Sequence, residues 1–161
     1  MALLQILKDG DELLRKTSRP VEEITPRITT LLDDMVETMR EANGCGLAAP
    51  QVGVLRRVVV VECSPGKVYE LINPVIVATK GKQNEIEGCL SIPGKNGITE
   101  RPMYVTVEAL DRNGKKKRYK GEGLLARAFC HEIDHLDGIL FTDKALHMLT
   151  PEELKEYYEE E

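Results

Sequence analysis

One short segment near the C-terminal end constrains this chain most, because it combines two histidines with an acidic residue. His131, Glu132 and His135 form an H-E-x-x-H pattern, in which the histidines lie four positions apart. On a helix, that spacing places both imidazoles on one face, where they can bind the same metal ion. Glu132 lies beside them and is placed to move protons at a metal-bound water. The pattern therefore predicts part of a metal-dependent hydrolase site, although an exposed polar helix face would give the same letters.

The length and composition favour one globular domain that spans residues 1–161. Hydrophobic residues make up 42% of the chain and charged residues 30%, which is typical of a soluble protein. The net charge of −5 argues against strong or sequence-specific nucleic-acid binding, and we interpret the basic run at 115–118 as an exposed hairpin arm. No apolar stretch is long enough for a membrane span and no secretory signal precedes the domain, so we expect a cytoplasmic protein that does not bind membranes.

The hydrophobic pattern predicts helices toward both ends and strands between them. A helical turn is expected over 11–16, and a long helix should begin after Thr25 and Pro26. A second helix from about 123 should carry the H-E-x-x-H segment and stop at Gly138, and a last helix should begin at Thr150 with Glu153 completing a capping box. Strands are expected at 57–62, 68–72, 75–79, 83–89, 104–110 and 115–121, with a loop at 44–51.

This order of elements predicts an α+β fold. Asn113-Gly114 is a hairpin turn signal between the last two strands, so we expect antiparallel pairing there. The expected architecture is a set of antiparallel sheets packed around the central helix with the H-E-x-x-H segment. A long N-terminal helix and a short C-terminal helix complete it.

A catalytic metal site of this kind needs a third protein ligand. Zincin proteases take it from downstream of H-E-x-x-H, but the downstream candidates form no such pattern, and we interpret His147 as a surface residue. Upstream, Cys89 lies at the end of an expected strand. The four cysteines of this chain are expected to be reduced, so any special role should be in metal binding or catalysis.

Three segments together resemble the peptide deformylase family. They are residues 44–51 (G-C-G-L-A-A-P-Q), 87–91 (E-G-C-L-S) and 130–135 (C-H-E-I-D-H), in the order and with the separations of that family. Two positions depart from its pattern: Cys130 replaces a glutamine, and Cys45 replaces an aliphatic residue. We interpret Cys130 as a packing residue, and neither departure affects a chemical role.

The resemblance implies that Cys89, His131 and His135 bind one divalent metal ion with water in the fourth position. A thiolate and two imidazoles suit Fe(II), Zn(II), Ni(II) or Co(II). By resemblance we expect Fe(II) in the cell, while zinc, nickel or cobalt can occupy the site in a purified sample.

The resemblance also implies the reaction, which is removal of the N-formyl group from the first methionine of newly made polypeptides as formate. Metal-bound water attacks the formyl carbonyl, and Glu132 takes the proton and passes it to the leaving amine. The side-chain amide of Gln51 and the backbone N–H of Leu90 stabilise the oxyanion. N-formylmethionyl nascent polypeptides are therefore the expected partners, with the ribosome near its exit tunnel as a further one.

The peptide is expected to lie extended along Cys45, Gly46 and Gly88 by strand addition, which binds main chain without selecting sequence. The methionine pocket is expected at Cys45, Leu124, Ala128 and the ring of His131, with the stem of Arg127 nearby. Core packing explains Leu124 and Ala128 equally well.

Glu87 and Asp134 are candidates to orient the histidines, although Asp134 could instead pair with Arg101. Two alternative functions remain open at this point. A zincin-type metallopeptidase would cut internal peptide bonds, and a non-catalytic metal-binding module would close its site with a fourth protein ligand.

Overall fold

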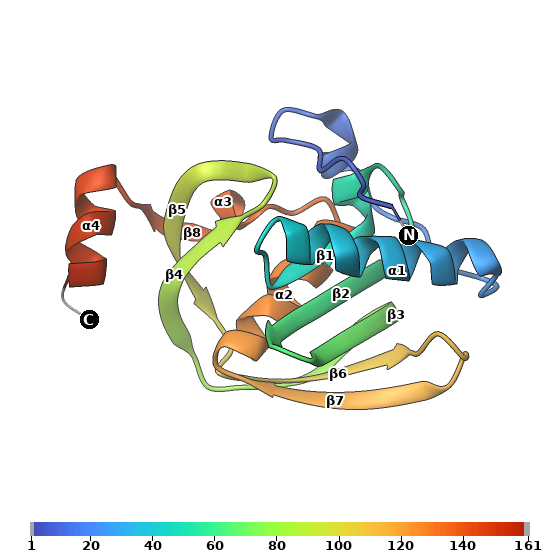
Figure 1. Cartoon of the computed structure of the whole chain (residues 1–161). Coiled ribbons are helices and arrows are strands. Elements are labelled where there is room, and N and C mark those ends of the chain that lie inside the picture. Colours follow the sequence, from blue (N-terminus) through green and yellow to red (C-terminus); the bar gives the residue numbers. More distant parts are fainter. Residues whose placement is uncertain (1, 160–161) are drawn as a thin grey trace.

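The computed structural model describes residues 2–159 as two antiparallel sheets that enclose the helix α2, as Figure 1 shows. The larger sheet has five strands in the order β1-β2-β3-β6-β7, and the smaller has three in the order β4-β5-β8. The larger sheet contains β1 (Gly46–Ala48), β2 (Val58–Ser64), β3 (Lys67–Lys80), β6 (Tyr104–Leu110) and β7 (Lys116–Glu122). The smaller contains β4 (Gln83–Cys89), β5 (Ile92–Arg101) and β8 (Ala145–Met148).

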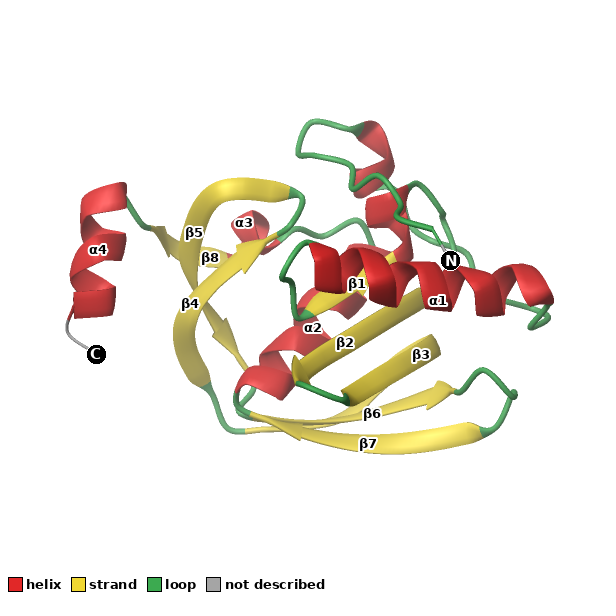
Figure 2. Ribbon diagram, viewed as in Figure 1, coloured by secondary structure: helices red, strands yellow, loops and turns green. Residues whose placement is uncertain are grey.

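Helices lie on both faces of the larger sheet, as can be followed in Figure 2. The elements are η1 (Glu12–Arg15), α1 (Pro26–Glu41), η2 (Ala49–Val52), α2 (Leu124–Leu136), α3 (Phe141–Lys144) and α4 (Pro151–Glu159). The α+β fold predicted from the sequence is confirmed, including the central position of the helix with the H-E-x-x-H segment. Among the described residues, no helix is long and apolar enough to cross a membrane.

The strand β2 separates two hydrophobic cores. Val58 and Val60 pack with Met35 of α1, whereas Val59 and Val61 pack against Phe129 and its neighbours on α2. Successive strand residues point to opposite faces, so a strand covered on both faces reads as a continuous apolar run. All four valines are fully buried. The valines therefore pack α1 and α2 against opposite faces of the same strand and set the distance between these two helices.

The expected separation of 68–72 from 75–79 is wrong, because both belong to the single strand β3. Its pairing with β6 shifts register between Ile72 and Val75, and Asn73 takes a positive φ of 53°. The Asn73 side chain accepts a hydrogen bond from Val21 N over 2.8 Å and donates to Val21 O over 2.9 Å. These bonds compensate the irregular backbone, so the strand bends at Asn73 without ending.

Other segments also differ from the expectation, mainly where pairing with a distant strand outweighs the local sequence signal. The expected loop at 44–51 contains β1 and η2, since pairing with β2 makes residues 46–48 a strand. The strands β5 and β8 and the short helix α3 were not expected. The first six residues of β5 include a proline and two glycines, and the pairing of this strand with β4 and β8 outweighs that low strand propensity.

The helix ends were predicted well. Gly138 stops α2 with a φ of 73°, and its N–H donates to His135 O over 3.1 Å. Thr150 and Glu153 form the expected reciprocal cap, each backbone N–H donating to the other side chain over 3.1 Å. Thr25 occupies the N-cap position of α1, but its side chain makes no capping hydrogen bond.

Candidate metal and catalytic site

The side chains of Cys89, His131 and His135 converge between the end of β4 and the helix α2. Their ligand atoms all lie within 4.8 Å of one another. His135 Nε2 is 3.4 Å from Cys89 Sγ and 3.3 Å from His131 Nε2. The spacing of four positions on α2 brings the two imidazoles together, and the end of β4 supplies the thiol.

These three residues fit a divalent transition metal. Two imidazole nitrogens that face each other at 3.3 Å need an electrophile between them or a shared proton. Burial, followed by the neighbouring His131, lowers the pKa of His135 well below its usual value, so that imidazole stays neutral as a ligand must. One sulfur and two nitrogen donors suit iron, zinc, nickel or cobalt. Magnesium and calcium prefer oxygen ligands and fit this set poorly.

A buried carboxylate orients His131 from the side opposite the cluster. His131 Nδ1 donates to Glu87 Oε2 over 2.6 Å, which leaves its Nε2 facing the other ligands. Glu87 also accepts from Arg101 over 2.7 Å, from Arg127 over 2.8 Å and from Thr99 over 2.9 Å. Burial opposes ionisation, but the hydrogen bonds from His131 and Arg101 hold the pKa of Glu87 well below its usual range. Glu87 therefore favours one tautomer and one ring position of His131, a candidate ligand.

Arg127 and Asp134 belong to the same network. The Arg127 guanidinium is buried and binds Glu87 and Thr99, which leaves only the stem of this side chain for the methionine pocket, as the sequence analysis expected. Asp134 accepts from Arg101 over 2.7 Å, which is the ion pair that the sequence left open, and no hydrogen bond is found from it to either histidine. Thr99 and Arg127 were not predicted for this network, because nothing local in β5 or α2 indicates which carboxylate they meet.

The side chain of Glu132 extends from α2 toward β1, where it is shielded from solvent. Its carboxyl is buried, with Oε2 3.9 Å from His131 Nε2, and Oε1 has no hydrogen-bond partner among the described residues. Burial raises the pKa of Glu132 to about 8. A Cβ atom on Gly46 would lie 2.5 Å from Oε2, so the carboxyl occupies the space that any side chain on residue 46 would need. The carboxyl is thus held beside the ligand cluster in a setting suited to accepting and releasing a proton.

Gln51 extends from η2 toward the thiol. Its Oε1 accepts from Ala48 N over 2.9 Å, and its Nε2 donates to Ser91 Oγ over 3.0 Å and to Cys89 Sγ over 3.6 Å. These contacts fix the orientation of the amide, with its N–H groups on the side of the cluster. Ser91 was not predicted as a partner, although it is the last residue of the segment at 87–91. Leu90 lies in the turn between β4 and β5, where its side chain packs against Gly44.

The residues expected to bind peptide occupy the edge beside this cluster. The strand β1 lies at the edge of the larger sheet, and Cys45 immediately precedes it. Gly88 lies next to Cys89 at the end of β4. Leu124, at the start of α2, is 57% exposed, so core packing does not explain it, whereas Ala128 is buried in the core cluster.

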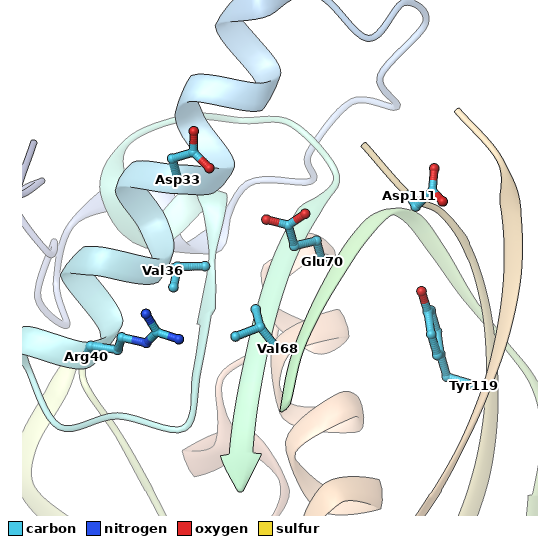
Figure 3. A pocket seen from close by; sticks show the side chains of 7 residues that line it. All are labelled: Asp33, Val36, Arg40, Val68, Glu70, Asp111 and Tyr119. Carbon is cyan, nitrogen blue, oxygen red and sulfur yellow. The ribbon is translucent and has the colours of Figure 1, made fainter. Parts of the chain in front are cut away.

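Two hollows elsewhere on the surface contain none of these site residues. The one in Figure 3 has a volume of about 410 Å³, and its Asp33 and Glu70 side chains are already bound by Arg112. The other, of about 1150 Å³, lies between the start of α1 and residues 53–56. The hollow in Figure 3 is lined by Asp33, Val36, Arg40, Val68, Glu70, Asp111 and Tyr119.

His147, interpreted above as a surface residue, is exposed, and its imidazole lies 2.8 Å from the carboxylate of Glu153.

Comparisons with known proteins agree with this arrangement. The family model for polypeptide deformylase matches residues 3–150. A peptide deformylase of Acetivibrio thermocellus is 59% identical over 155 residues, which cover 96% of this chain and 91% of that protein. A peptide deformylase of Alkaliphilus metalliredigens is 58% identical over 91% of this chain and 99% of that protein.

Solved structures give the same result. The peptide deformylase of Thermotoga maritima matches with a TM-score of 0.87 and 34% identity, over 90% of this chain and 99% of that chain. That of Legionella pneumophila matches with a TM-score of 0.87 and 41% identity, over 98% of this chain and 96% of that chain. The chain therefore belongs to the peptide deformylase family, the metal-dependent hydrolases that remove the formyl group from the N-terminal formylmethionine of polypeptides.

Proposed function

We propose that this hydrolase, a single catalytic domain, performs deformylation at the cluster of Cys89, His131 and His135. The observation that carries the proposal is the convergence of these three ligand atoms beside a buried, unpaired carboxyl oxygen of Glu132. We expect the ion to be Fe(II) in the cell, with zinc, nickel or cobalt as substitutes in a purified sample. When bound, it would polarise the formyl carbonyl and make a hydroxide nucleophile available near neutral pH.

Glu132 is the proton carrier in this proposal. Because burial raises its pKa to about 8, the carboxyl can gain and lose a proton near neutral pH. It would accept the proton of the attacking water and then donate it to the nitrogen of the cleaved amide. Its contact with Gly46 holds it in place for both transfers.

Gln51 and Leu90 would stabilise the negative charge that develops on the formyl oxygen. The Gln51 amide is already oriented by Ala48 and Ser91, so little reorganisation is needed when the charge forms. The Leu90 N–H lies in the turn directly after Cys89, and we propose it as the second donor.

The substrate would add as an extended strand along Cys45 and Gly46 of the larger sheet and Gly88 of the smaller. Main-chain pairing at such an edge binds peptides of many sequences. Leu124, Ala128 and the ring of His131 would form the methionine pocket, with exposed Leu124 at its mouth. Since nascent polypeptides are made in the cytoplasm, we propose that the enzyme acts there, near the ribosomal exit tunnel.

The decisive experiment measures formate release from a short formyl-methionyl peptide under anaerobic conditions. Glu132→Ala is expected to lower kcat by about 10²–10⁴-fold while retaining metal, because only the proton carrier is lost. Full activity in this variant would contradict the role of Glu132. An unformylated peptide serves as the control, and cleavage of internal bonds would instead support the zincin-type alternative.

The ligand set is tested separately by metal content. Cys89→Ala is expected to lose the metal, since two imidazoles alone bind weakly. Cys130→Ala is the matched control, because Cys130 lies on α2 next to His131 but belongs to the hydrophobic core. Stoichiometric metal in the Cys89 variant would point to another third ligand.

A further inference from the structure

The two proposed oxyanion donors come from segments that belong to different sheets. Gln51 lies on η2, which directly follows β1 of the larger sheet, whereas Leu90 lies in the turn between β4 and β5 of the smaller sheet. The hydrogen bond from Gln51 Nε2 to Ser91 Oγ joins the two segments, and both side chains are at most 1% exposed. The separation of the two donors therefore depends on what holds η2 against the β4–β5 turn.

The short segment at 7–9 hydrogen-bonds the backbone of both. Leu7 N–H donates to Gln51 O over 2.7 Å. Asp9 N–H donates to Ser91 O, also over 2.7 Å. Because these donors are only two residues apart, one piece of backbone spans the gap between η2 and the β4–β5 turn. The Leu7 side chain also packs in the small hydrophobic cluster next to this turn, which anchors the segment there.

The chain that follows this segment reaches the helix with the two histidines. Ser18 N–H donates to Leu136 O over 2.8 Å at the end of α2. Gly138, which stops α2, lies so close to the backbone of Arg15 that a Cβ atom there would collide with it. The chain at 7–18 therefore contacts all three parts of the site, namely η2, the β4–β5 turn and α2.

We propose that the segment at 7–9 and the Ser91 hydroxyl are positioning elements of the oxyanion site. They hold the Gln51 amide and the Leu90 N–H at the separation that the developing charge requires. The segment acts through the backbones that it binds, and the hydroxyl acts through the amide that it orients. The inference rests on the proposed function, in which Gln51 and Leu90 are the donors. Donors fixed in advance need not move as charge develops, and a displacement of about 1 Å can lower a rate by about 10²-fold.

Loss of this positioning should lower kcat and leave KM unchanged. The full negative charge on the formyl oxygen exists only in the transition state, so a displaced donor weakens substrate binding little. A purely structural role would instead lower the free energy of unfolding or the metal content, and would leave kcat per bound metal ion unchanged. The two roles are therefore distinguishable by kinetics.

The first test is a double-mutant cycle in the nickel-loaded enzyme, with kcat expressed per bound nickel ion. Gln51→Ala should lower kcat by about 10²–10³-fold. Ser91→Ala should lower it by about tenfold, since the amide keeps its bond from Ala48 N. The double variant should be no slower than Gln51→Ala, because the hydroxyl acts only through that amide. Multiplied effects, or an unchanged kcat in Ser91→Ala, would overturn the role of the hydroxyl.

The second test removes single backbone donors and changes no side chain. Native chemical ligation at Cys45 can join a synthetic N-terminal segment to the rest of the chain, with one amide replaced by an ester. An ester at Leu7 or Asp9 should lower kcat by about tenfold at unchanged KM. The matched control is an ester at Lys8, whose N–H makes no hydrogen bond among residues 2–159. Equal kcat in all three ester variants would overturn the role of the segment.

These outcomes separate the inference from the proposed function. A normal kcat in Gln51→Ala would remove the proposed oxyanion donor, and the inference with it. A slow Gln51→Ala together with normal Ser91→Ala and ester variants would keep the donor and overturn only the positioning role. Lower stability or metal content with unchanged kcat per nickel ion would also overturn that role.

Discussion

Two arginine–carboxylate clusters on opposite sides of the larger sheet make a natural comparison. In the inner cluster, Glu87 binds Arg101 and Arg127, and these side chains are only 3–5% exposed. In the outer cluster, beside the hollow in Figure 3, Arg112 binds Asp33 and Glu70, and exposure ranges from 21% to 44%. A buried charge needs its partner to offset the cost of removal from water, whereas an exposed charge that loses its partner can bind water instead. Similar bonds therefore have different roles: the inner set orients His131, a proposed metal ligand, and the outer set links α1 to the sheet.

The largest expected effect comes from removing the shared inner charge. Glu87→Gln leaves Arg101 and Arg127 buried with one fewer counter-charge, so the free energy of unfolding should fall by about 3–5 kcal/mol. Urea denaturation measures this change, and metal affinity should fall with it because His131 loses its orienting carboxylate. Equal losses for Glu87→Gln and Glu70→Gln would remove the distinction between the clusters.

A smaller effect is expected at Arg127. Arg127→Met keeps the length of the side chain but removes two donors to Glu87 and Thr99, while Arg101 still pairs with Glu87. The free energy of unfolding should fall by about 1–3 kcal/mol, and metal affinity by roughly tenfold. KM of the fully metal-loaded variant should not change. If KM rose while stability stayed the same, Arg127 would belong to the methionine pocket wall, as the sequence suggested.

The outer cluster should tolerate loss of one charge. Glu70→Gln leaves Arg112 paired with Asp33 at the surface, so the free energy of unfolding should change by less than about 1 kcal/mol. The difference in free energy of unfolding between Glu70→Gln and the unmodified chain should decrease further as salt is added, since salt screens exposed charges. Denaturation at low and high ionic strength checks this, with formate release expected at the level of the unmodified enzyme.

The smallest expected effect on the free energy of unfolding comes from the exposed pair of Arg40 and Glu62. It should be detectable in the pH dependence of that free energy. The hydrogen bonds from Arg40 lower the pKa of Glu62 from 4.5 to about 2. The ionised form is favoured by folding, so its contribution is full above pH 4.5 and is lost as pH falls toward 2. Comparing unfolding across that window for the unmodified chain and Arg40→Gln should show a shallower fall in the variant. Parallel curves would mean that the pair contributes nothing.

The sequence predicted those features that depend on neighbouring residues. The spacing of His131 and His135 requires only a helix, and the Thr150–Glu153 cap requires only four consecutive positions. The valine run at the start of β2 and the Asn113-Gly114 turn are similarly local signals. The convergence of Cys89 with the histidines came from resemblance to a family, and the structure brings these side chains together.

The rest depends on partners far along the chain, which no local pattern reveals. Thr99 and Arg127 reach Glu87 only because β5 folds back on β4 and lies against α2. The strand β5 itself was missed, since its glycines and proline indicate a turn when read alone. The Gln51–Ser91 bond joins residues forty positions apart and depends on the docking of η2 near the end of β4.

The contact between Gly46 and Glu132 has a consequence for altering this enzyme's peptide preference. The carboxyl of Glu132, the proposed proton carrier, fills the space beside the backbone of Gly46, along which we propose that the substrate binds. Position 46 therefore has no room for a side chain while the Glu132 carboxyl stays in place. In a library randomised there, active members should converge on glycine alone, because even a methyl group displaces the carboxyl.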